Sequence, residues 1–175
     1  MINRQSCLTT IVKVDVINGT TSADVDSLAK ILLDNENEKF TEEISHTKYE
    51  DCICPPNNIV NNIIDEMISD FKEATGEDIA CVEYWGHIHD KNMSTNQHNH
   101  NTYFASAVCY LSVPDGSGSL VFVPKVNPYN ESTFKCEFAP KKGRYYMFPS
   151  YLDHFVTRNN SEEKRISISF NFERA

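Results

Sequence analysis

The sequence predicts a mainly β protein with supporting helices, an α+β fold in which two N-terminal helices pack on one face of an antiparallel sandwich or barrel. Three observations predict this fold. Two stretches before residue 78 carry apolar residues at helical spacing. Six or more short runs of strand-forming residues follow them. Turn-forming residues, among them Gly116-Ser117-Gly118 and Lys141-Lys142-Gly143, separate several of these runs.

The first predicted elements are a strand and a helix. Residues 9–17 alternate polar and β-branched apolar side chains, which predicts a strand that ends at Asn18-Gly19. A helix capped by Thr21 or Ser22 is expected to run to Asp34. Its predicted apolar face consists of Val25, Leu28, Ala29, Leu32 and Leu33.

The second predicted helix spans residues 57–75, after Pro55-Pro56 and before Gly76. Its apolar stripe is broad, so we interpret it as a surface that packs on a sheet rather than a partner-binding face. The stripe consists of Ile59, Val60, Ile63, Ile64, Met67, Ile68 and Phe71. The strands predicted after it are Ile79 to His89, Thr102 to Val113, Ser119 to Pro124, Ser132 to Phe138, Gly143 to Phe148 and Arg165 to Glu173.

The length of 175 residues fits a single domain over 1–175, with the supporting elements in 1–78 and a strand-rich core in 79–175. The net charge is −9 with 16 lysines and arginines, so no basic surface for nucleic acid is expected. No apolar run is long enough for a membrane span, and the N-terminus does not resemble a signal peptide. We therefore expect a cytoplasmic protein whose six cysteines are thiols.

The motif Gln97-His98-Asn99-His100 is a candidate metal site. Side chains two apart on a strand point to the same face, with Cα atoms roughly 6.5 Å apart. Both imidazoles could then reach one ion, because neutral imidazole suits iron, zinc, copper and nickel. The alternative is a pair of solvated histidines in a loop rich in asparagine.

The last predicted strand offers a carboxylate-binding site. One of its faces carries Arg165, Ser167, Ser169 and Asn171, and the other carries only apolar residues. Arginine offers a bidentate fork, and a serine two residues away adds a third donor, which suits a carboxylate. The alternative is a surface strand whose polar face lies in water.

The order of these motifs resembles that of the iron(II)- and 2-oxoglutarate-dependent oxygenases, in particular an uncharacterised group related to the prolyl 4-hydroxylases. The resemblance covers about Val82 to Glu173 and includes five features in sequence. They are His98-x-His100, Cys109-Tyr110-Leu111, Leu120-Val121-Phe122, Phe148-Pro149-Ser150 with His154 after it, and Arg165-Ile-Ser-Ile-Ser-Phe-Asn171.

The resemblance implies a double-stranded β-helix, which is a jelly-roll, cupin-like barrel, with Fe(II) near its open end. It assigns His98 and His154 as metal ligands, and Arg165, Ser167 and Tyr110 as the residues that hold the far carboxylate of 2-oxoglutarate. The implied enzyme hydroxylates a peptidyl or amino-acid substrate with O₂ and releases succinate and CO₂. No side chain beyond the metal ligands is expected to be catalytic.

One position departs from the family, which usually has His-x-Asp or His-x-Glu in the first motif. Here the third residue is His100, and we favour it as the third ligand because Asp90 and Asp153 lack the spacing. His98, His100 and Tyr110 would share one face of an unbroken strand.

The pair His87-Ile88-His89 also has ligand spacing, and a four-histidine zinc site built from both pairs is conceivable. We interpret His87, His89, Trp85 and Asn171 instead as groups beside the metal ligands or the substrate. Two alternatives to the predicted activity are a three-histidine dioxygenase that does not use 2-oxoglutarate and a cupin-like binding module without turnover. Neither needs a carboxylate clamp on the last strand.

Overall fold

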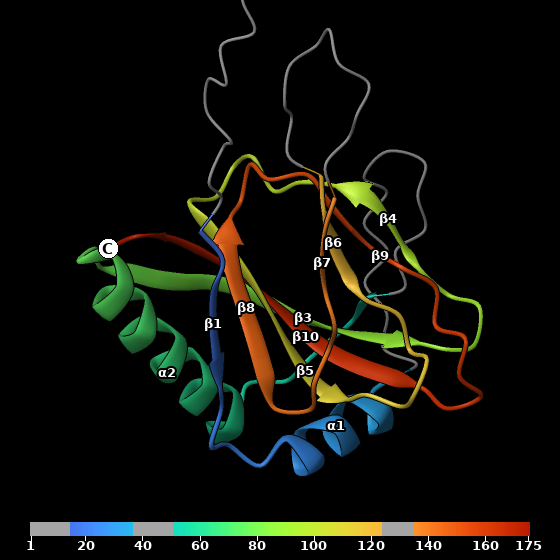
Figure 1. Cartoon of the computed structure of the whole chain (residues 1–175). Helices are drawn as coiled ribbons and strands as arrows, with labels where there is room; N and C mark the ends of the chain where they lie inside the picture. The colour runs from blue at the N-terminus through green and yellow to red at the C-terminus, as the bar shows by residue number, and fades with distance from the viewer. Residues whose placement is uncertain (1–14, 37–50, 124–134) are drawn as a thin grey trace, which may run out of the picture.

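The computed structural model describes residues 15–36, 51–123 and 135–175, which form two antiparallel sheets (Figure 1). The large sheet has the strand order β1 (Ile17–Thr20), β8 (Arg144–Pro149), β5 (Ala105–Ser112), β10 (Arg165–Arg174), β3 (Ile79–His89) and β2 (Asp51–Cys52). The small sheet has the order β4 (Thr95–His98), β9 (His154–Val156), β6 (Leu120–Phe122) and β7 (Cys136–Phe138). The prediction of a mainly β protein with antiparallel sheets is confirmed.

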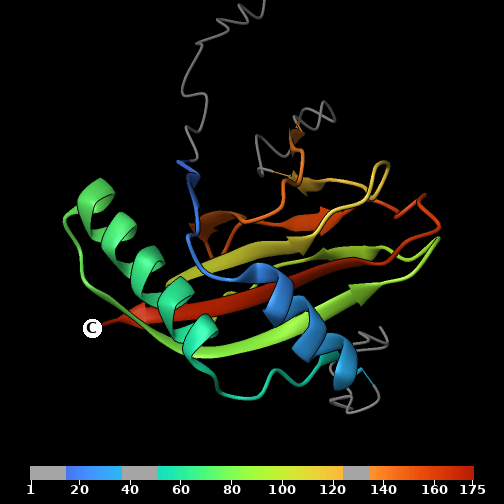
Figure 2. The ribbon, with the colours of Figure 1, turned by 90° about the horizontal axis from the view of Figure 1, so that it is seen from below.

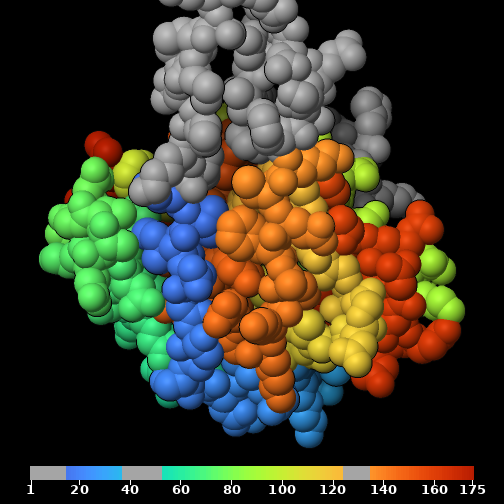
Figure 3. Space-filling view, in the orientation of Figure 1, coloured from blue at the N-terminus to red at the C-terminus, as the bar shows by residue number. Residues whose placement is uncertain are grey.

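Both helices, α1 (Val25–Asp34) and α2 (Asn58–Thr75), cover one face of the large sheet, and the small sheet lies across the other face (Figure 2). On the surface, β1 lies between α2 and the segment around β8 (Figure 3). No helix in the described ranges is long and apolar enough to cross a membrane. The four cysteines whose side chains are described, Cys54, Cys81, Cys109 and Cys136, are free thiols.

The second helix agrees with its prediction. The side chain of Asn57 caps it by accepting a hydrogen bond of 3.0 Å from the backbone N–H of Val60. Gly76 ends it with φ = 77°, a left-handed conformation that glycine adopts without strain. The apolar stripe packs on the sheet, which confirms its packing role, and its buried residues are Val60, Ile63, Met67 and Phe71.

The first helix begins later than predicted. Asp24 caps it, accepting a hydrogen bond of 3.1 Å from the backbone N–H of Ser27, so Thr21 and Ser22 are not the cap. Asp24 offers a carboxylate at the position where the chain actually turns into the helix. Leu33 is 38% exposed and does not belong to the buried face.

The first strand also differs from its prediction. Most of the predicted range, residues 9–17, lies outside the described residues, and β1 pairs with β8 through Ile17–Thr20. Asn18 and Gly19 therefore lie within a strand and do not end one. Gly19 serves close packing here, because a Cβ atom at this position would overlap the hydroxyl of Tyr145 and crowd the carboxylate of Asp70. That hydroxyl donates a hydrogen bond of 2.6 Å to Asp70 on α2.

We expect Gly19→Ala to lower the free energy of unfolding by about 1–3 kcal/mol, because the added methyl group must displace a packed ring. Thermal unfolding of the variant measures this loss. In a Tyr145→Ala background the same substitution should cost much less, since the obstructing ring is absent and Asp70, no longer held by the Tyr145 hydroxyl, can turn away. Equal costs in both backgrounds would contradict the packing explanation.

Strand β10 separates two cores. Ile166, Ile168, Phe170 and Phe172 are buried on the side of the helices, as the alternation in the sequence predicts. A second apolar cluster lies toward the small sheet and contains Tyr110, Leu120, Phe122, Tyr146, Phe148 and Leu152. The small sheet covers the polar face of β10, so this face does not lie in water. The alternative of a surface strand is therefore wrong.

Candidate functional site

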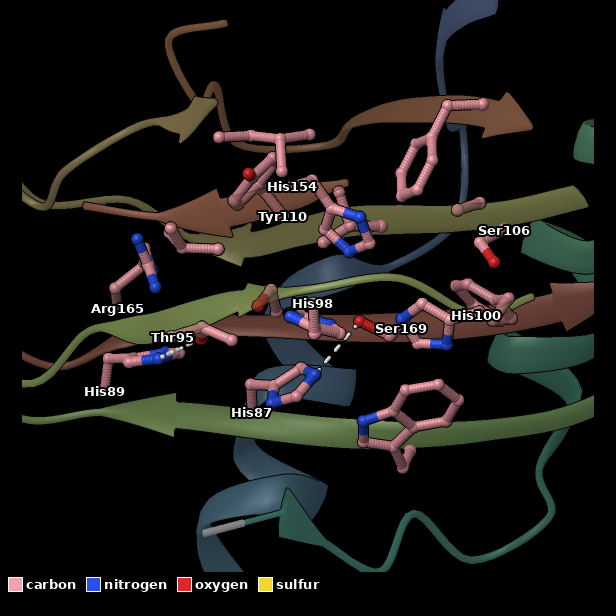
Figure 4. A pocket seen from close by; sticks show the side chains of 18 residues that line it. His87, His89, Thr95, His98, His100, Ser106, Tyr110, His154, Arg165 and Ser169 are labelled. Carbon is pink, nitrogen blue, oxygen red and sulfur yellow. Dashed lines mark hydrogen bonds between the residues drawn. The ribbon is translucent and has the colours of Figure 1, made fainter. Parts of the chain in front are cut away.

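A pocket opens between the two sheets, and five of the six histidines of the chain line it (Figure 4). The sixth, His46, lies outside the described residues. The polar and aromatic residues of the lining include Trp85, His87, His89, Thr95, His98, His100, Ser106, Tyr110, His154, Arg165, Ser167 and Ser169. None of the described residues that line the pocket carries a carboxylate.

Three of these histidines converge on one point. His98, His100 and His154 each offer one ring nitrogen as a ligand atom, and these three atoms all lie within 4.8 Å of one another. His98 ends β4 and lies directly opposite His154 on β9, with ring centroids 4.3 Å apart. His100 follows in the next turn, where its backbone N–H donates a hydrogen bond of 2.7 Å to the carbonyl of Ser150.

Backbone carbonyls set the tautomers of two of the three imidazoles. The Nδ1 atom of His98 lies 2.8 Å from the carbonyl oxygen of Asn96, and that of His154 lies 2.9 Å from the carbonyl oxygen of Leu152. A carbonyl only accepts, so each Nδ1 carries the proton and each Nε2 presents a lone pair. Metal-ligating histidines are commonly oriented by such a hydrogen bond on the second nitrogen.

Burial keeps His154 neutral. Desolvation, together with the nearby imidazole of His98, lowers the pKa of His154 to about 3. A neutral imidazole is the form that binds a metal ion. The three side chains therefore fit a metal ion by distance and, for His154, by protonation state.

The expectation of one unbroken strand from His98 to Tyr110 is wrong. Strand β4 ends at His98, and β5 begins at Ala105 in the other sheet, so the two residues face each other from opposite walls. His100 lies in the turn between the two strands, with its ring centroid 5.8 Å from that of Trp85 and the two ring planes inclined by 29°.

The carboxylates considered as alternative ligands are engaged elsewhere. Asp90 is exposed and forms an ion pair of 3.3 Å with Lys164. Asp153 accepts a hydrogen bond of 2.6 Å from the side chain of Asn99. Neither belongs to the side-chain cluster that could hold an ion in the described part of the chain.

The predicted carboxylate clamp lies on the large sheet within the same pocket. Ser167 on β10 lies directly opposite Tyr110 on β5, and Arg165 lies two residues before Ser167, at the start of β10. Arg165 is 1% exposed, and its Nη1 donates a hydrogen bond of 2.9 Å to the carbonyl of Ser117. Its Nε and the hydroxyl of Tyr110 are buried without hydrogen-bond partners among the described residues.

Arg165 has no counter-charge in the described part of the chain. No described carboxylate pairs with it, and burial lowers the pKa of its guanidinium group. Burial also raises the pKa of the Tyr110 hydroxyl, which stays protonated and available as a donor. Because an unpaired buried charge is costly, this end of the pocket fits an anion such as a carboxylate.

The second histidine pair lies beside the cluster and not in it. His87 shares a hydrogen bond of 3.0 Å with Ser169, and His89 shares one of 3.0 Å with Thr95. Among the described side chains, the group able to hold an ion does not include His87 or His89, so a four-histidine site is not assembled. The sequence carried no signal for Thr95, which lies in an unpatterned polar stretch.

Asn171, the last residue of the polar face, belongs to a hydrogen-bond network at the far end of the same face. Its Oδ1 accepts a hydrogen bond of 2.7 Å from Ser106, whose hydroxyl also lies 2.7 Å from that of Ser150. Its Nδ2 donates to Glu83. The backbone carbonyl of Ser150 holds His100, so this network connects β10 to the turn that carries His100.

Several solved structures share this fold. The non-heme alpha-ketoglutarate-dependent epimerase SnoN of nogalamycin biosynthesis matches with a TM-score of 0.69 and 13% identity, over 93% of this chain and 76% of that protein. A prolyl-4-hydroxylase of Pseudomonas putida matches with a TM-score of 0.60 and 14% identity, over 91% of this chain and 88% of that one.

A 2OG-Fe(II) oxygenase family oxidoreductase of Burkholderia pseudomallei matches with a TM-score of 0.58 and 19% identity, over 71% of this chain. This chain spans 61% of the length of that protein. SnoN has also been solved in complex with Fe³⁺ and alpha-ketoglutarate. At these identities the likenesses establish the fold alone.

The family is established by sequence. No curated protein sequence matches the chain. Residues 83–171, just over half of the chain, match the family described as "Putative 2OG-Fe(II) oxygenase". This range includes the three converging histidines, the buried arginine and the tyrosine beside it. The chain therefore belongs to the 2OG-Fe(II) oxygenases, enzymes that depend on Fe(II) and 2-oxoglutarate.

Proposed function

We propose that the protein hydroxylates a C–H bond of a peptidyl or amino-acid substrate. One atom of O₂ enters the new hydroxyl group, and the other enters succinate as 2-oxoglutarate loses CO₂. One observation carries the use of 2-oxoglutarate: the buried Arg165, which has no counter-charge among the described residues, lies in the same pocket as the three converging histidines. A metal centre alone would not require that cation. The substrate class rests on the likeness to the prolyl 4-hydroxylases.

We assign His98, His100 and His154 as the ligands of Fe(II), which supplies the reactivity toward O₂ when it is bound. Their own contribution is positional. The carbonyls of Asn96 and Leu152 hold two imidazoles with Nε2 toward the common point, and Trp85 stacks on the third. A rigid set of three imidazole donors would leave other positions of the ion accessible to co-substrate and O₂.

We assign Arg165, Ser167 and Tyr110 to the distal carboxylate of 2-oxoglutarate. Arg165 supplies the balancing charge, and the unpartnered hydroxyl of Tyr110 supplies a neutral donor. Trp85, which lines the pocket, is proposed to border the substrate. Asn171 is proposed to support the turn that carries His100 through Ser106, whose hydroxyl bonds both Asn171 and Ser150. Two facing antiparallel sheets with the site between them support the further proposal that the core is a double-stranded β-helix of the jelly-roll type.

Anaerobic titration tests this function. Protein loaded with Fe(II) should gain a visible charge-transfer band when 2-oxoglutarate is added, and should release succinate once air is admitted. Oxygen uptake without any need for 2-oxoglutarate would instead support the three-histidine dioxygenase. Iron binding without turnover of any kind would support the binding module.

We expect His100→Ala to weaken Fe(II) binding as much as His98→Ala does, because each variant removes one of three ligands. His100→Asp should restore iron binding more fully than turnover, since a shorter anionic ligand must lie within about 0.5 Å of a productive position. Equilibrium dialysis with Fe(II) measures both effects. Asp90→Asn is the control and should keep full affinity; a loss there, with His100→Ala unaffected, would transfer the assignment to Asp90.

A further inference from the structure

We propose that His89 is an additional donor to the distal carboxylate of 2-oxoglutarate and helps the protein to select a dicarboxylic co-substrate. This inference rests on the proposed function. The sequence suggested a place for His89 beside the metal ligands or the substrate, and the proposal moves it to the end of the pocket that binds the co-substrate.

The strand register places His89 beside the clamp. His89 on β3 lies directly opposite Arg165 on β10, and opposite residues of an antiparallel pair point to the same face. Both line the pocket, and Figure 4 shows them together at one end, away from His100. A carboxylate that binds the Arg165 guanidinium is therefore adjacent to the imidazole of His89.

The hydrogen bonds of His89 leave one nitrogen for a ligand. Its Nε2 lies 3.0 Å from the hydroxyl of Thr95 on β4, a contact that joins the two sheets. Its Nδ1 is buried and has no hydrogen-bond partner among the described residues. When the Thr95 hydroxyl donates to Nε2, the proton of the neutral ring lies on Nδ1, which then becomes a donor.

The charge state fits a single carboxylate. Burial, together with the neighbouring Arg165, lowers the pKa of His89 to about 2, so the imidazole is neutral. One cation then balances one anion, and neutral donors serve the remaining lone pairs, since a carboxylate accepts about four hydrogen bonds. Two of those donors, the Tyr110 hydroxyl and His89 Nδ1, lack partners among the described residues.

His87 provides a matched control. It lies on the same strand and face, two residues away, and also lines the pocket. It lies opposite Ser167, and its Nε2 is paired with Ser169. A general disturbance of β3 would affect variants at both positions, whereas loss of a carboxylate donor would affect only variants of His89.

The experiment compares two ligands by calorimetry on the Fe(II)-loaded protein without oxygen. The ligands are 2-oxoglutarate and 2-oxobutyrate, a 2-oxo acid without the distal carboxylate. His89→Gln keeps an amide near Nε2 for Thr95 but has no donor at Nδ1. It should bind 2-oxoglutarate about 10- to 100-fold more weakly, the range for a hydrogen bond to a charged group, and 2-oxobutyrate as before.

The remaining variants complete the test. His89→Asn carries an amide nitrogen near the position of Nδ1 and should recover most of the preference for 2-oxoglutarate. His87→Gln should keep the full preference. If His89→Gln does not fold, His89→Phe removes the same donor within a ring of similar shape.

Each outcome decides one question. If the ratio of the two affinities in His89→Gln or His89→Phe equals that of the wild type, the role of His89 is overturned. An equal fold-loss for both ligands is such a result. This outcome leaves the proposed function intact if the wild type binds 2-oxoglutarate. Failure of the wild type itself to bind 2-oxoglutarate would overturn the proposed function.

Discussion

His154→Ala is expected to lower Fe(II) affinity by far more than 100-fold while the protein stays folded. Changes beside a metal ligand typically cost 10–100-fold, and loss of one ligand out of three must exceed that range. His154 is also the most buried of the three, at 5% exposure, and its ring is held by the Leu152 carbonyl. No other described side chain is close enough to replace it.

Iron content after dialysis, with thermal unfolding as the test of folding, measures this effect. His87→Ala is the matched control, because it removes a histidine of the same pocket that lies outside the cluster. The control should retain iron. Unchanged iron stoichiometry in His154→Ala would remove this residue from the metal centre.

Arg165→Ala is expected to raise the dissociation constant of 2-oxoglutarate by at least 100-fold and to leave iron binding intact. Loss of one partner from a buried, hydrogen-bonded ion pair costs about 3–5 kcal/mol, and each 1.4 kcal/mol is about tenfold in affinity. Without its ligand, Arg165 has no compensating carboxylate among the described residues. The ion pair therefore forms only when 2-oxoglutarate binds, and its full free energy contributes to the affinity.

Anaerobic titration of the Fe(II)-loaded variant with 2-oxoglutarate measures this constant. Arg165→Lys should recover only part of the affinity, because an ammonium group cannot reproduce the planar fork. Arg158→Ala, at an exposed position, should behave as wild type. If Arg165→Ala binds as tightly as wild type and Arg158→Ala does not, the clamp belongs to Arg158.

Local patterns in the sequence were sufficient for those parts of the protein that depend on local geometry. Helix α2 was predictable because its asparagine cap, its apolar stripe and Gly76 all act within a few residues of one another. The two faces of β10 were predictable because strand alternation is a property of neighbouring residues, so Arg165 and Ser167 were correctly placed together. The longer runs of strand-forming residues were correctly predicted to be strands, and β3 has the predicted bounds.

Sheet membership depended on the tertiary structure. The short strands β4 and β9, with four and three residues, were not predicted, because segments of this length carry no usable periodicity. They place His98 and His154 opposite each other and turn the chain across to the other sheet before Tyr110. The prediction that His98, His100 and Tyr110 share one face of an unbroken strand is wrong because of this turn. The three residues nevertheless line the same pocket.

The sequence by itself determined which side chains were available: two histidine pairs, a third histidine motif, and an arginine and serine on one strand face. Only the tertiary structure decided their states. Burial between two sheets makes His154 neutral. Among the described residues it leaves Arg165 without a counter-charge and the Nδ1 atom of His89 without a hydrogen-bond partner. Desolvation depends on what the rest of the chain places around a group, so no local pattern could have predicted these three states.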